Sequence, residues 1–153
     1  MPMIEITEGS RAPAFDIPAD SGGRAILSGP SVVFFYPKAD TPGCTNEAID
    51  FSTHVDAFKA AGFQVIGISR DPVKKLDRFK AKHDLKVVLG SDEEGAVTEA
   101  WGVWVPKTLY GREYMGIERA TFLVDAAGTV TKVWRQVRVK GHAEAVLAAA
   151  QEL

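Results

Sequence analysis

Residues 31–36 read Ser31-Val32-Val33-Phe34-Phe35-Tyr36, an apolar run that lies between Pro30 and Pro37. A short apolar run bounded by prolines is typical of a strand that is buried on both faces of a sheet. Residues 63–69 form a second run of this kind. Between the two, residues 45–60 place apolar side chains at the spacing of a helix with one buried face. A strand, a helix and a second strand in this order predict a layered α/β sheet.

The rest of the chain continues this pattern outward. Asp71 and Pro72 are the expected N-cap and first residue of a second helix. The remaining predicted elements are a strand at 86–89, a helix at 93–101, a long loop at 103–116, a hairpin of strands at 119–124 and 129–134, and a helix at 142–151. We therefore predict a single α/β domain, residues 1–153, with a central mixed sheet flanked by helices on both faces.

The composition is that of an ordinary globular protein, with 46% hydrophobic residues, 25% charged residues and a net charge of −2. Nothing in this balance indicates a nucleic-acid or membrane partner. Residues 1–14 lack the apolar segment of a signal peptide, and no apolar run has the length of a membrane span. We therefore expect the protein to be cytoplasmic.

The chain has one cysteine, Cys44, so it cannot form an internal disulfide. Its three histidines, His54, His83 and His142, are far apart in the sequence and lack the spacing of metal ligands. We interpret the histidines as surface or capping residues and expect no metal site.

Cys44 follows a turn rich in proline and glycine, residues 37–43, and falls where the helical spacing begins. The start of a helix has unpaired N–H groups and the positive end of the helix dipole, so it favours an anion. A thiol in this position is expected to act as a thiolate nucleophile. The alternative is a buried, inert cysteine, since free cysteines are among the most buried residues. Core cysteines lie mostly within apolar runs, whereas Cys44 lies next to a turn.

A thiolate that reduces a peroxide needs hydrogen-bond donors for the charge that develops on the departing oxygen. Thr41 offers a hydroxyl that can accept and donate hydrogen bonds, and the backbone N–H groups of Gly43 and Cys44 lie at the helix start. Pro37 has no N–H and shapes the turn. The best candidate for a fixed cation is Arg119, which opens a predicted strand and stays charged near neutral pH.

Three segments of the chain resemble one protein family. Residues 35–45, FYPKADTPGCT, are similar to the peroxidatic motif Pro-x-x-x-Thr-x-x-Cys of the peroxiredoxins. Together with residues 67–71 and 110–125, they resemble the bacterioferritin comigratory protein, or peroxiredoxin Q, subfamily. This resemblance implies a thioredoxin-like fold. It also implies a thiol-dependent peroxidase that reduces hydrogen peroxide and organic hydroperoxides without a metal or organic cofactor.

The resemblance further implies roles for single residues. Cys44 matches the peroxidatic cysteine, which passes through a sulfenic acid, and Pro37 and Thr41 match the proline and threonine of the motif. Arg119 matches the active-site arginine. Glu47 matches a position near that arginine where the family usually has Glu or Gln.

The chain departs from the subfamily at its second, resolving cysteine. In many members this residue lies five positions after the first, which is Ile49 here, or in the next helix, near Lys80. The chain therefore resembles a one-cysteine variant, in which an external thiol reduces oxidised Cys44. That thiol would be thioredoxin, glutaredoxin or a low-molecular-weight thiol.

The resemblance also bears on assembly and on the alternative function. We expect a monomer or weak homodimer, because the chain lacks the long C-terminal arm of ring-forming peroxiredoxins. A thiol-based redox sensor or binding protein, in which Cys44 turns over slowly, stays open as the alternative function. Such sensors usually have a resolving cysteine nearby, and this chain has none.

Overall fold

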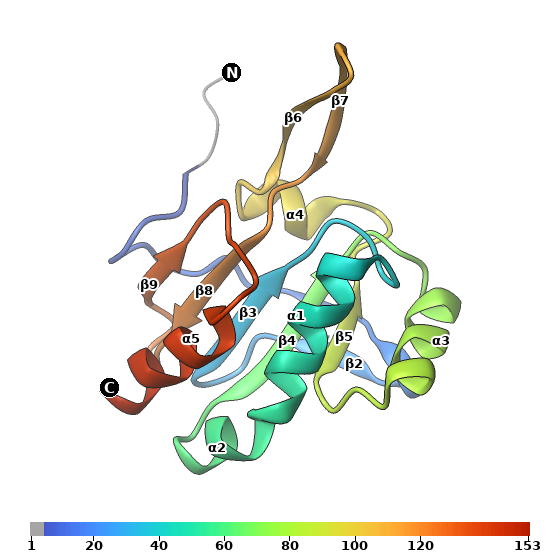
Figure 1. The fold of residues 1–153 in the computed structure, drawn as a ribbon. Coiled ribbons are helices and arrows are strands. Elements are labelled where there is room, and N and C mark those ends of the chain that lie inside the picture. The colour runs from blue at the N-terminus through green and yellow to red at the C-terminus, as the bar shows by residue number, and fades with distance from the viewer. Residues whose placement is uncertain (1–4) are drawn as a thin grey trace.

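The centre of the structure is a five-stranded mixed sheet (Figure 1). The computed structural model describes residues 5–153, so residues 1–4 of the predicted domain lie outside the described part. In spatial order the strands are β5 (Val88–Ser91), β4 (Gln64–Ser69), β3 (Ser31–Phe35), β8 (Ala120–Val124) and β9 (Val130–Trp134). The first three strands are parallel, whereas β8 runs antiparallel to β3 and to β9. The predicted mixed α/β sheet is confirmed.

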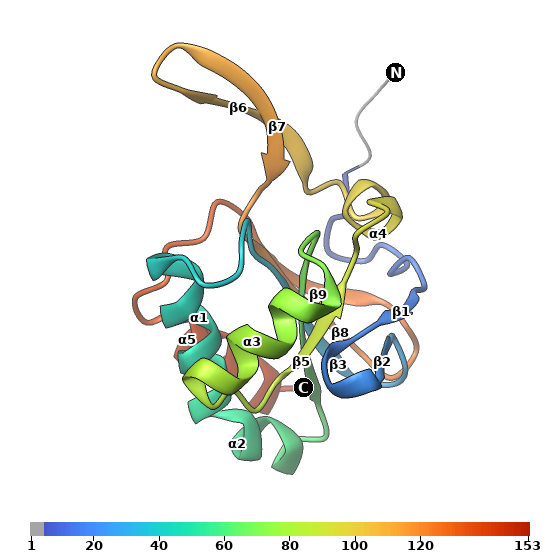
Figure 2. The ribbon, with the colours of Figure 1, turned by 90° about the vertical axis from the view of Figure 1, so that its right-hand side faces the viewer.

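Helices cover the two faces of the sheet unequally (Figures 1 and 2). One face carries α1 (Pro42–Thr53), α2 (Val55–Ala60), α3 (Val73–His83) and α5 (His142–Gln151). The other carries α4 (Ala96–Ala100) and a ribbon of β1 (Asp16–Pro18) and β2 (Arg24–Ile26), which a short 3-10 helix, Asp20–Gly22, connects. None of the helices within residues 5–153 is long and apolar enough to cross a membrane.

Strand β3 is the centre of both hydrophobic cores. All five of its residues are fully buried, as the apolar run predicted. Val32 and Phe34 point into the core beneath α1 and α3, and Val33 and Phe35 point into the opposite core beside Trp101. The alternation follows from the period of two in a strand. The rigid strand therefore delivers the turn that follows it to a defined place at the edge of the sheet.

Two local predictions need correction. The predicted helix at 45–60 is two helices, because the backbone of His54 (φ −101°, ψ 8°) separates α1 from α2. Asp71 is not the N-cap of α3: that position belongs to Pro72, and α3 has no side-chain cap. The carboxylate of Asp71 instead accepts hydrogen bonds from another part of the chain, described below.

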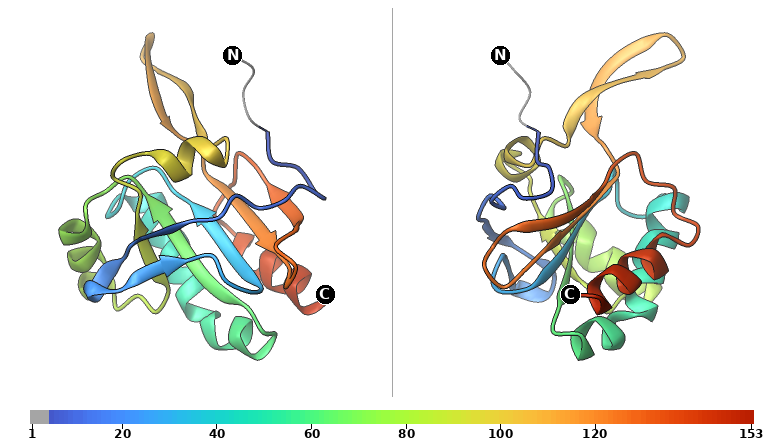
Figure 3. Two further views of the ribbon diagram at one scale, coloured as in Figure 1. Left: turned by 180° about the vertical axis from the view of Figure 1, so that it is seen from behind. Right: turned by 90° about the vertical axis from the view of Figure 1, so that its left-hand side faces the viewer.

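The predicted loop at 103–116 is wrong. This segment forms a hairpin of β6 (Trp104–Leu109) and β7 (Arg112–Ile117), which projects beyond the rest of the fold (Figures 1 and 3). Tyr110 and Gly111 connect the strands with positive φ angles of 50° and 77°, as a two-residue hairpin turn requires. Pro106 argued against a strand, but β6 pairs with β7 alone among the described strands and tolerates a proline at its other edge.

Candidate active site around Cys44

The register of the sheet brings Cys44 and Arg119 together. Phe35 at the end of β3 pairs with Ala120 at the start of β8, because the two strands are antiparallel. The turn that leads to Cys44 and the residue that precedes β8 therefore lie at the same edge of the sheet. The Nη2 group of Arg119 donates a hydrogen bond to the Sγ atom of Cys44 at 3.3 Å, although the residues are 75 positions apart.

Cys44 is the third residue of α1, and Thr41 is its N-cap. The first helical hydrogen bond runs from the N–H of Thr45 to the carbonyl of Thr41 at 2.8 Å. The N–H groups of Gly43 and Cys44 precede it and have no partner within the helix. Cys44 is 2% exposed, as the inert alternative requires. Its contact with a guanidinium argues against that alternative, because an inert buried thiol lies among apolar groups.

Arg119 also binds Glu47, one helical turn after Cys44. The Nη1 group of Arg119 lies 2.7 Å from Oε1 of Glu47, whose side chain is 1% exposed. Burial raises the pKa of Glu47 to about 7, even though the charge and hydrogen bond of Arg119 lower it. Burial lowers the pKa of Arg119, but Glu47 and then Cys44 outweigh this effect and raise it. The guanidinium thus stays charged while the carboxyl titrates near neutral pH.

Gly43 gives Arg119 its approach to the sulfur. A Cβ atom at Gly43 would lie 3.2 Å from Nη2 of Arg119, closer than a comfortable contact. Because glycine has no side chain, the guanidinium can lie against the first turn of α1. This contact explains the glycine immediately before Cys44.

The other predicted site residues, Thr41 and Pro37, lie in the turn between β3 and Cys44. The hydroxyl of Thr41 donates a hydrogen bond of 2.8 Å to the carbonyl of Lys38. Its only proton is therefore in use, and its lone pairs are the part that can meet a substrate. Pro37 borders a groove beneath the β6–β7 hairpin.

We call this cavity the hairpin groove. Its volume is about 390 Å³, and it lies between the turn after β3 and the base of the hairpin. The lining residues are Pro37, Lys38, Arg70, Asp71, Trp104, Lys107, Tyr114, Met115, Gly116 and Ile117. Neither Cys44 nor Arg119 lines the groove, but Pro37 belongs to the turn that precedes Cys44, and Ile117 lies two residues before Arg119.

Asp71 is a site residue that the sequence prediction missed. Its Oδ2 atom accepts hydrogen bonds of 2.7 Å from the N–H of Ala39 and from the hydroxyl of Ser69. Lys75 contributes an ion pair at 3.3 Å. Asp71 thereby ties the turn before Cys44 to the end of β4. The available signal was its place in residues 67–71, one of the three segments that resemble the family.

His142 was predicted to be a surface or capping residue and is instead buried. Its Nε2 atom lies 2.7 Å from the hydroxyl of Thr121, and its ring packs edge-on against Phe51 and Trp134. Burial, with a smaller contribution from Arg119, lowers the pKa of His142 to about 4. The imidazole is therefore neutral at physiological pH and adds no charge to the site.

The two positions considered for a second cysteine carry an exposed apolar residue and a lysine that forms an ion pair. Ile49 is 38% exposed on α1. Lys80, on α3, forms an ion pair of 2.7 Å with Oδ2 of Asp20, whose Oδ1 accepts a hydrogen bond of 2.9 Å from the N–H of Leu89. Lys80 thus joins α3 to the short helix between β1 and β2.

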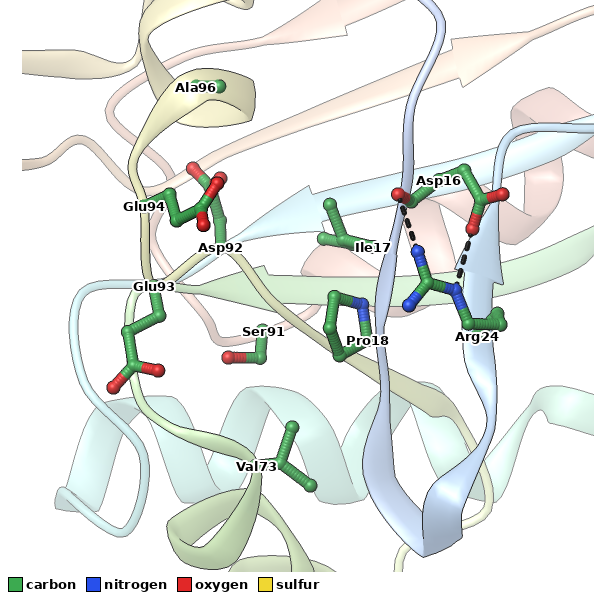
Figure 4. Close-up of a pocket in the computed structure, with 10 residues that line it drawn as sticks. All are labelled: Asp16, Ile17, Pro18, Arg24, Val73, Ser91, Asp92, Glu93, Glu94 and Ala96. Atoms are coloured by element: carbon green, nitrogen blue, oxygen red, sulfur yellow. Dashed lines mark hydrogen bonds and ion pairs between the residues drawn. The ribbon is translucent and has the colours of Figure 1, made fainter.

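A second cavity, of about 380 Å³, lies apart from Cys44 between the β1–β2 ribbon and the start of α4 (Figure 4). Several of its polar lining residues have partners within the fold. Arg24 pairs with Asp16 at 2.8 Å, and the carboxylate of Asp92 accepts hydrogen bonds from the N–H groups of Val97 and Thr98. None of the predicted site residues lines this cavity.

Proteins of similar sequence are peroxiredoxins. The pattern of the AhpC/TSA family matches residues 9–133. The chain belongs to the AhpC/TSA family. Peroxiredoxin Bcp of Xanthomonas campestris is 45% identical over 144 residues, which cover 90% of each protein. Peroxiredoxin Bcp of Bacillus subtilis is 44% identical over 143 residues, which cover 91% of this chain and 90% of the relative.

Solved structures lead to the same conclusion. Peroxiredoxin Q of X. campestris superposes on this peroxiredoxin with a TM-score of 0.88 at 39% identity and covers 97% of both chains. A cysteine-to-serine mutant of the Xylella fastidiosa PrxQ gives a TM-score of 0.91 at 32% identity, covering 97% of this chain and 98% of the other. The thioredoxin-like fold and the subfamily are confirmed, and this peroxiredoxin is a thiol-dependent peroxidase.

The number of cysteines distinguishes this peroxiredoxin from its X. campestris relative. Solved forms of that protein include serine mutants of two different cysteines. The present chain contains Cys44 and no other cysteine. It is therefore a one-cysteine member of the group.

Proposed function

We propose that Cys44 is the peroxidatic residue of this peroxidase. Its thiolate attacks the terminal oxygen of a hydroperoxide, so that an S–O bond forms and the O–O bond breaks. The other oxygen leaves as an alkoxide or hydroxide and takes up a proton from solvent, which yields an alcohol or water. Cys44 is oxidised to the sulfenic acid. The observation that carries this assignment is the hydrogen bond of 3.3 Å from Arg119 to the sulfur.

The groups around Cys44 divide the work of binding the peroxide. Thr41 accepts a hydrogen bond from the peroxide proton, because its own proton is donated to Lys38. The N–H groups of Gly43 and Cys44 and the guanidinium of Arg119 stabilise the negative charge that moves from sulfur to the departing oxygen. Pro37 excludes solvent from one side of the turn.

Glu47 acts through Arg119. The ion pair of 2.7 Å fixes the guanidinium in the plane from which its second N–H group reaches Cys44. A planar guanidinium can bind two partners at once in a fixed geometry, which a lysine cannot do. We therefore propose Glu47 as a positioning residue and Gly43 as the residue that admits the guanidinium.

The substrates follow from the site and from the relatives. A solved structure of the X. campestris bacterioferritin comigratory protein, 38% identical over 97% of this chain, concerns its alkyl peroxide reduction activity. We propose that the present enzyme reduces hydrogen peroxide and organic hydroperoxides. With one cysteine in the chain, the sulfenic acid must be reduced by an external thiol from thioredoxin, glutaredoxin or a small molecule. We further propose a single domain, a monomer or weak homodimer, and a cytoplasmic location.

A steady-state assay tests the proposal against the alternative of a slow redox sensor. Consumption of hydrogen peroxide and cumene hydroperoxide is measured with thioredoxin, glutaredoxin and small thiols as reductants. Many turnovers per enzyme molecule with at least one thiol are expected. Oxidation of Cys44 that stops after a single turnover with every thiol would favour the sensor.

A further inference from the structure

We propose that the hairpin groove binds the reducing thiol, and that it selects a small thiol that carries a carboxylate. This inference rests on the proposed role of Cys44 and adds the chemical class of the second substrate. Since the chain supplies no resolving cysteine, the second thiol must be recognised from solution.

The shape of the groove fits such a molecule. Its volume of about 390 Å³ falls within the range of small-ligand sites. Tyr114 and Met115 on β7 line one side and offer apolar surface to an aliphatic chain. Pro37 and Lys38 line the side that leads to Cys44. This side of the groove therefore belongs to the turn that ends at Cys44.

The charges in the groove favour an anion. Lys38, Arg70 and Lys107 line it, against one carboxylate, that of Asp71. Asp71 is already used by Ala39, Ser69 and Lys75. Neither Lys38, Arg70 nor Lys107 has an ion-pair partner among residues 5–153. Three cations without carboxylate partners create a positive potential that a bound carboxylate would offset.

Arg70 is fixed in the wall of the groove. Its guanidinium lies 3.4 Å from the centre of the Trp104 ring and donates hydrogen bonds to Thr98 and to the carbonyl of Gly95. None of these partners neutralises its charge. Arg70 is therefore a preorganised positive group, whereas Lys38 is an exposed side chain that can adapt to the ligand.

Lys107 connects the groove electrostatically to the active site. Burial and then the charge of Arg119 lower the pKa of Lys107, while Cys44 and Glu118 act in the opposite direction. Lys107 is thus close enough to Arg119 and Cys44 for their charges to affect its pKa. The positive charges of Lys107 and Arg119 repel each other, and a bound carboxylate would offset this repulsion.

A thiol bound in the groove would reduce the Cys44 sulfenic acid in two steps. The thiolate of the bound thiol attacks the sulfur of the Cys44 sulfenic acid; a disulfide bond forms, and the S–O bond breaks. The hydroxide takes up a proton and leaves as water. A second thiol molecule then attacks the mixed disulfide and releases Cys44 as the thiolate. A thiol held in the groove attacks Cys44 at a higher effective concentration than a thiol that is free in solution.

Single-turnover kinetics test this inference separately from the peroxide step. Cys44 is oxidised with one equivalent of hydrogen peroxide, and the sulfenic acid is confirmed by intact mass. It is then mixed with 3-mercaptopropionate, 2-mercaptoethanol or cysteamine, which are anionic, neutral and cationic. Each rate constant is corrected for the thiolate fraction and nucleophilicity of the reagent. We expect the anionic thiol to react roughly five- to tenfold faster than the cationic thiol, with a difference that shrinks as salt is added.

Charge variants of the groove locate the effect. Lys107→Gln should reduce the ratio of the anionic to the cationic rate constant at least roughly twofold, and Lys107→Glu should reverse the preference. The matched control is Lys59→Gln, which removes the same charge from an exposed position on α2 and should leave the ratio unchanged. Circular dichroism checks that each variant is folded.

The outcomes separate this inference from the proposed function. Equal corrected rates for the three thiols, or equal effects of Lys107→Gln and Lys59→Gln on the ratio, would overturn the groove assignment while Cys44 still forms a sulfenic acid. Slow reaction with every small thiol and fast reaction with thioredoxin would also overturn it in favour of a protein reductant. Failure to form any sulfenic acid would instead refute the proposed function.

Discussion

The first turn of α1 and the middle of α3 are the positions at which the resemblance predicts the peroxidatic cysteine and, in many members, a resolving cysteine. This chain has a cysteine at the first position and a lysine at the second. At the first, Cys44 lies in contact with Arg119, which in turn binds Glu47. At the second, Lys80 forms an ion pair with Asp20 on a neighbouring segment. Both helices pack on the same face of the sheet (Figure 1). The first place carries groups suited to redox chemistry, and the second carries a contact that holds the fold together.

The difference fits the proposal that this chain carries only the peroxidatic half of a two-cysteine mechanism. In the proposed mechanism, the oxidation half uses the groups at the edge of β3 and β8. In the proposed mechanism, an external thiol carries out the reduction half. If this account is correct, substitutions around Cys44 should change catalysis and leave the fold, whereas substitution of Lys80 should change stability and leave catalysis.

Replacement of the sulfur should have the largest effect. Cys44→Ser should lower thiol-dependent peroxide consumption to background, because no other side chain in this protein can form the sulfenic acid and a serine hydroxyl cannot. The unfolding transition should stay close to that of the wild type. Substantial thiol-dependent turnover by a folded Cys44→Ser protein would refute the assignment.

Removal of the cation should have the second largest effect. Arg119→Met should slow Cys44 oxidation at least roughly tenfold, which corresponds to about 1.4 kcal/mol, because a charge-assisted hydrogen bond to the sulfur is lost. Stopped-flow oxidation with hydrogen peroxide measures this step. Arg24→Met, which breaks an exposed pair with Asp16, is the control and should react at the wild-type rate.

Arg119→Met also leaves Glu47 buried without its partner, which can destabilise the fold. The double variant Arg119→Met/Glu47→Gln removes this charge and should be as slow as the single variant. Oxidation at the wild-type rate by either folded protein would show that Arg119 does not serve the thiol.

Substitution of Glu47 should have a smaller effect, which appears in the pH dependence of the free energy of unfolding. Its pKa in the folded protein, about 7, is above the ordinary value of 4.5. The neutral form therefore stabilises the fold below pH 4.5, and this stabilisation is lost as the pH rises through about 7, by at most about 1.4 kcal/mol per pH unit. Urea unfolding is measured as a function of pH in a Cys44→Ser background, which removes the thiol from the comparison. Glu47→Gln should flatten the profile between these pH values, and an unchanged slope would contradict the assignment.

Lys80 should show the smallest effect on catalysis and a clear effect on stability. Lys80→Met leaves the nearly buried carboxylate of Asp20 without its ion pair and should lower the free energy of unfolding by about 1–3 kcal/mol. The rate of Cys44 oxidation should not change. Lys86→Met, which breaks an exposed pair with Asp84, should cost less than about 1 kcal/mol. A slower oxidation step in Lys80→Met would break the contrast between the two places.

The parts of this molecule that sequence could predict are those whose signal is local. Strand β3 and helix α5 are correct because apolar runs and helical spacing report burial directly. The hairpin at 104–117 was missed because most of it is exposed, so no burial pattern marks its strands. The feature that marks this segment as a hairpin is the two-residue turn at Tyr110 and Gly111.

In the candidate active site, too, the residues with a local sequence signal were the ones predicted. Cys44 and Thr41 lie in one continuous motif, and Arg119 was assigned from the family resemblance. The role of Asp71 and the burial of His142 depend on partners in other elements, Ala39 and Thr121, so a local interpretation as caps or surface residues failed. The hairpin groove could be identified only from the three-dimensional structure, since its walls come from residues 37–38, residues 70–71 and the β6–β7 hairpin.

Intact-mass spectrometry of the oxidised enzyme tests the central claim most directly. Reduced protein is treated with one equivalent of hydrogen peroxide and divided, and a small thiol is added to one half. We predict a gain of one oxygen in the first half and a mixed disulfide with the added thiol in the second, both lost in Cys44→Ser. Unchanged mass in both halves, with Cys44 still open to alkylation, would contradict the account.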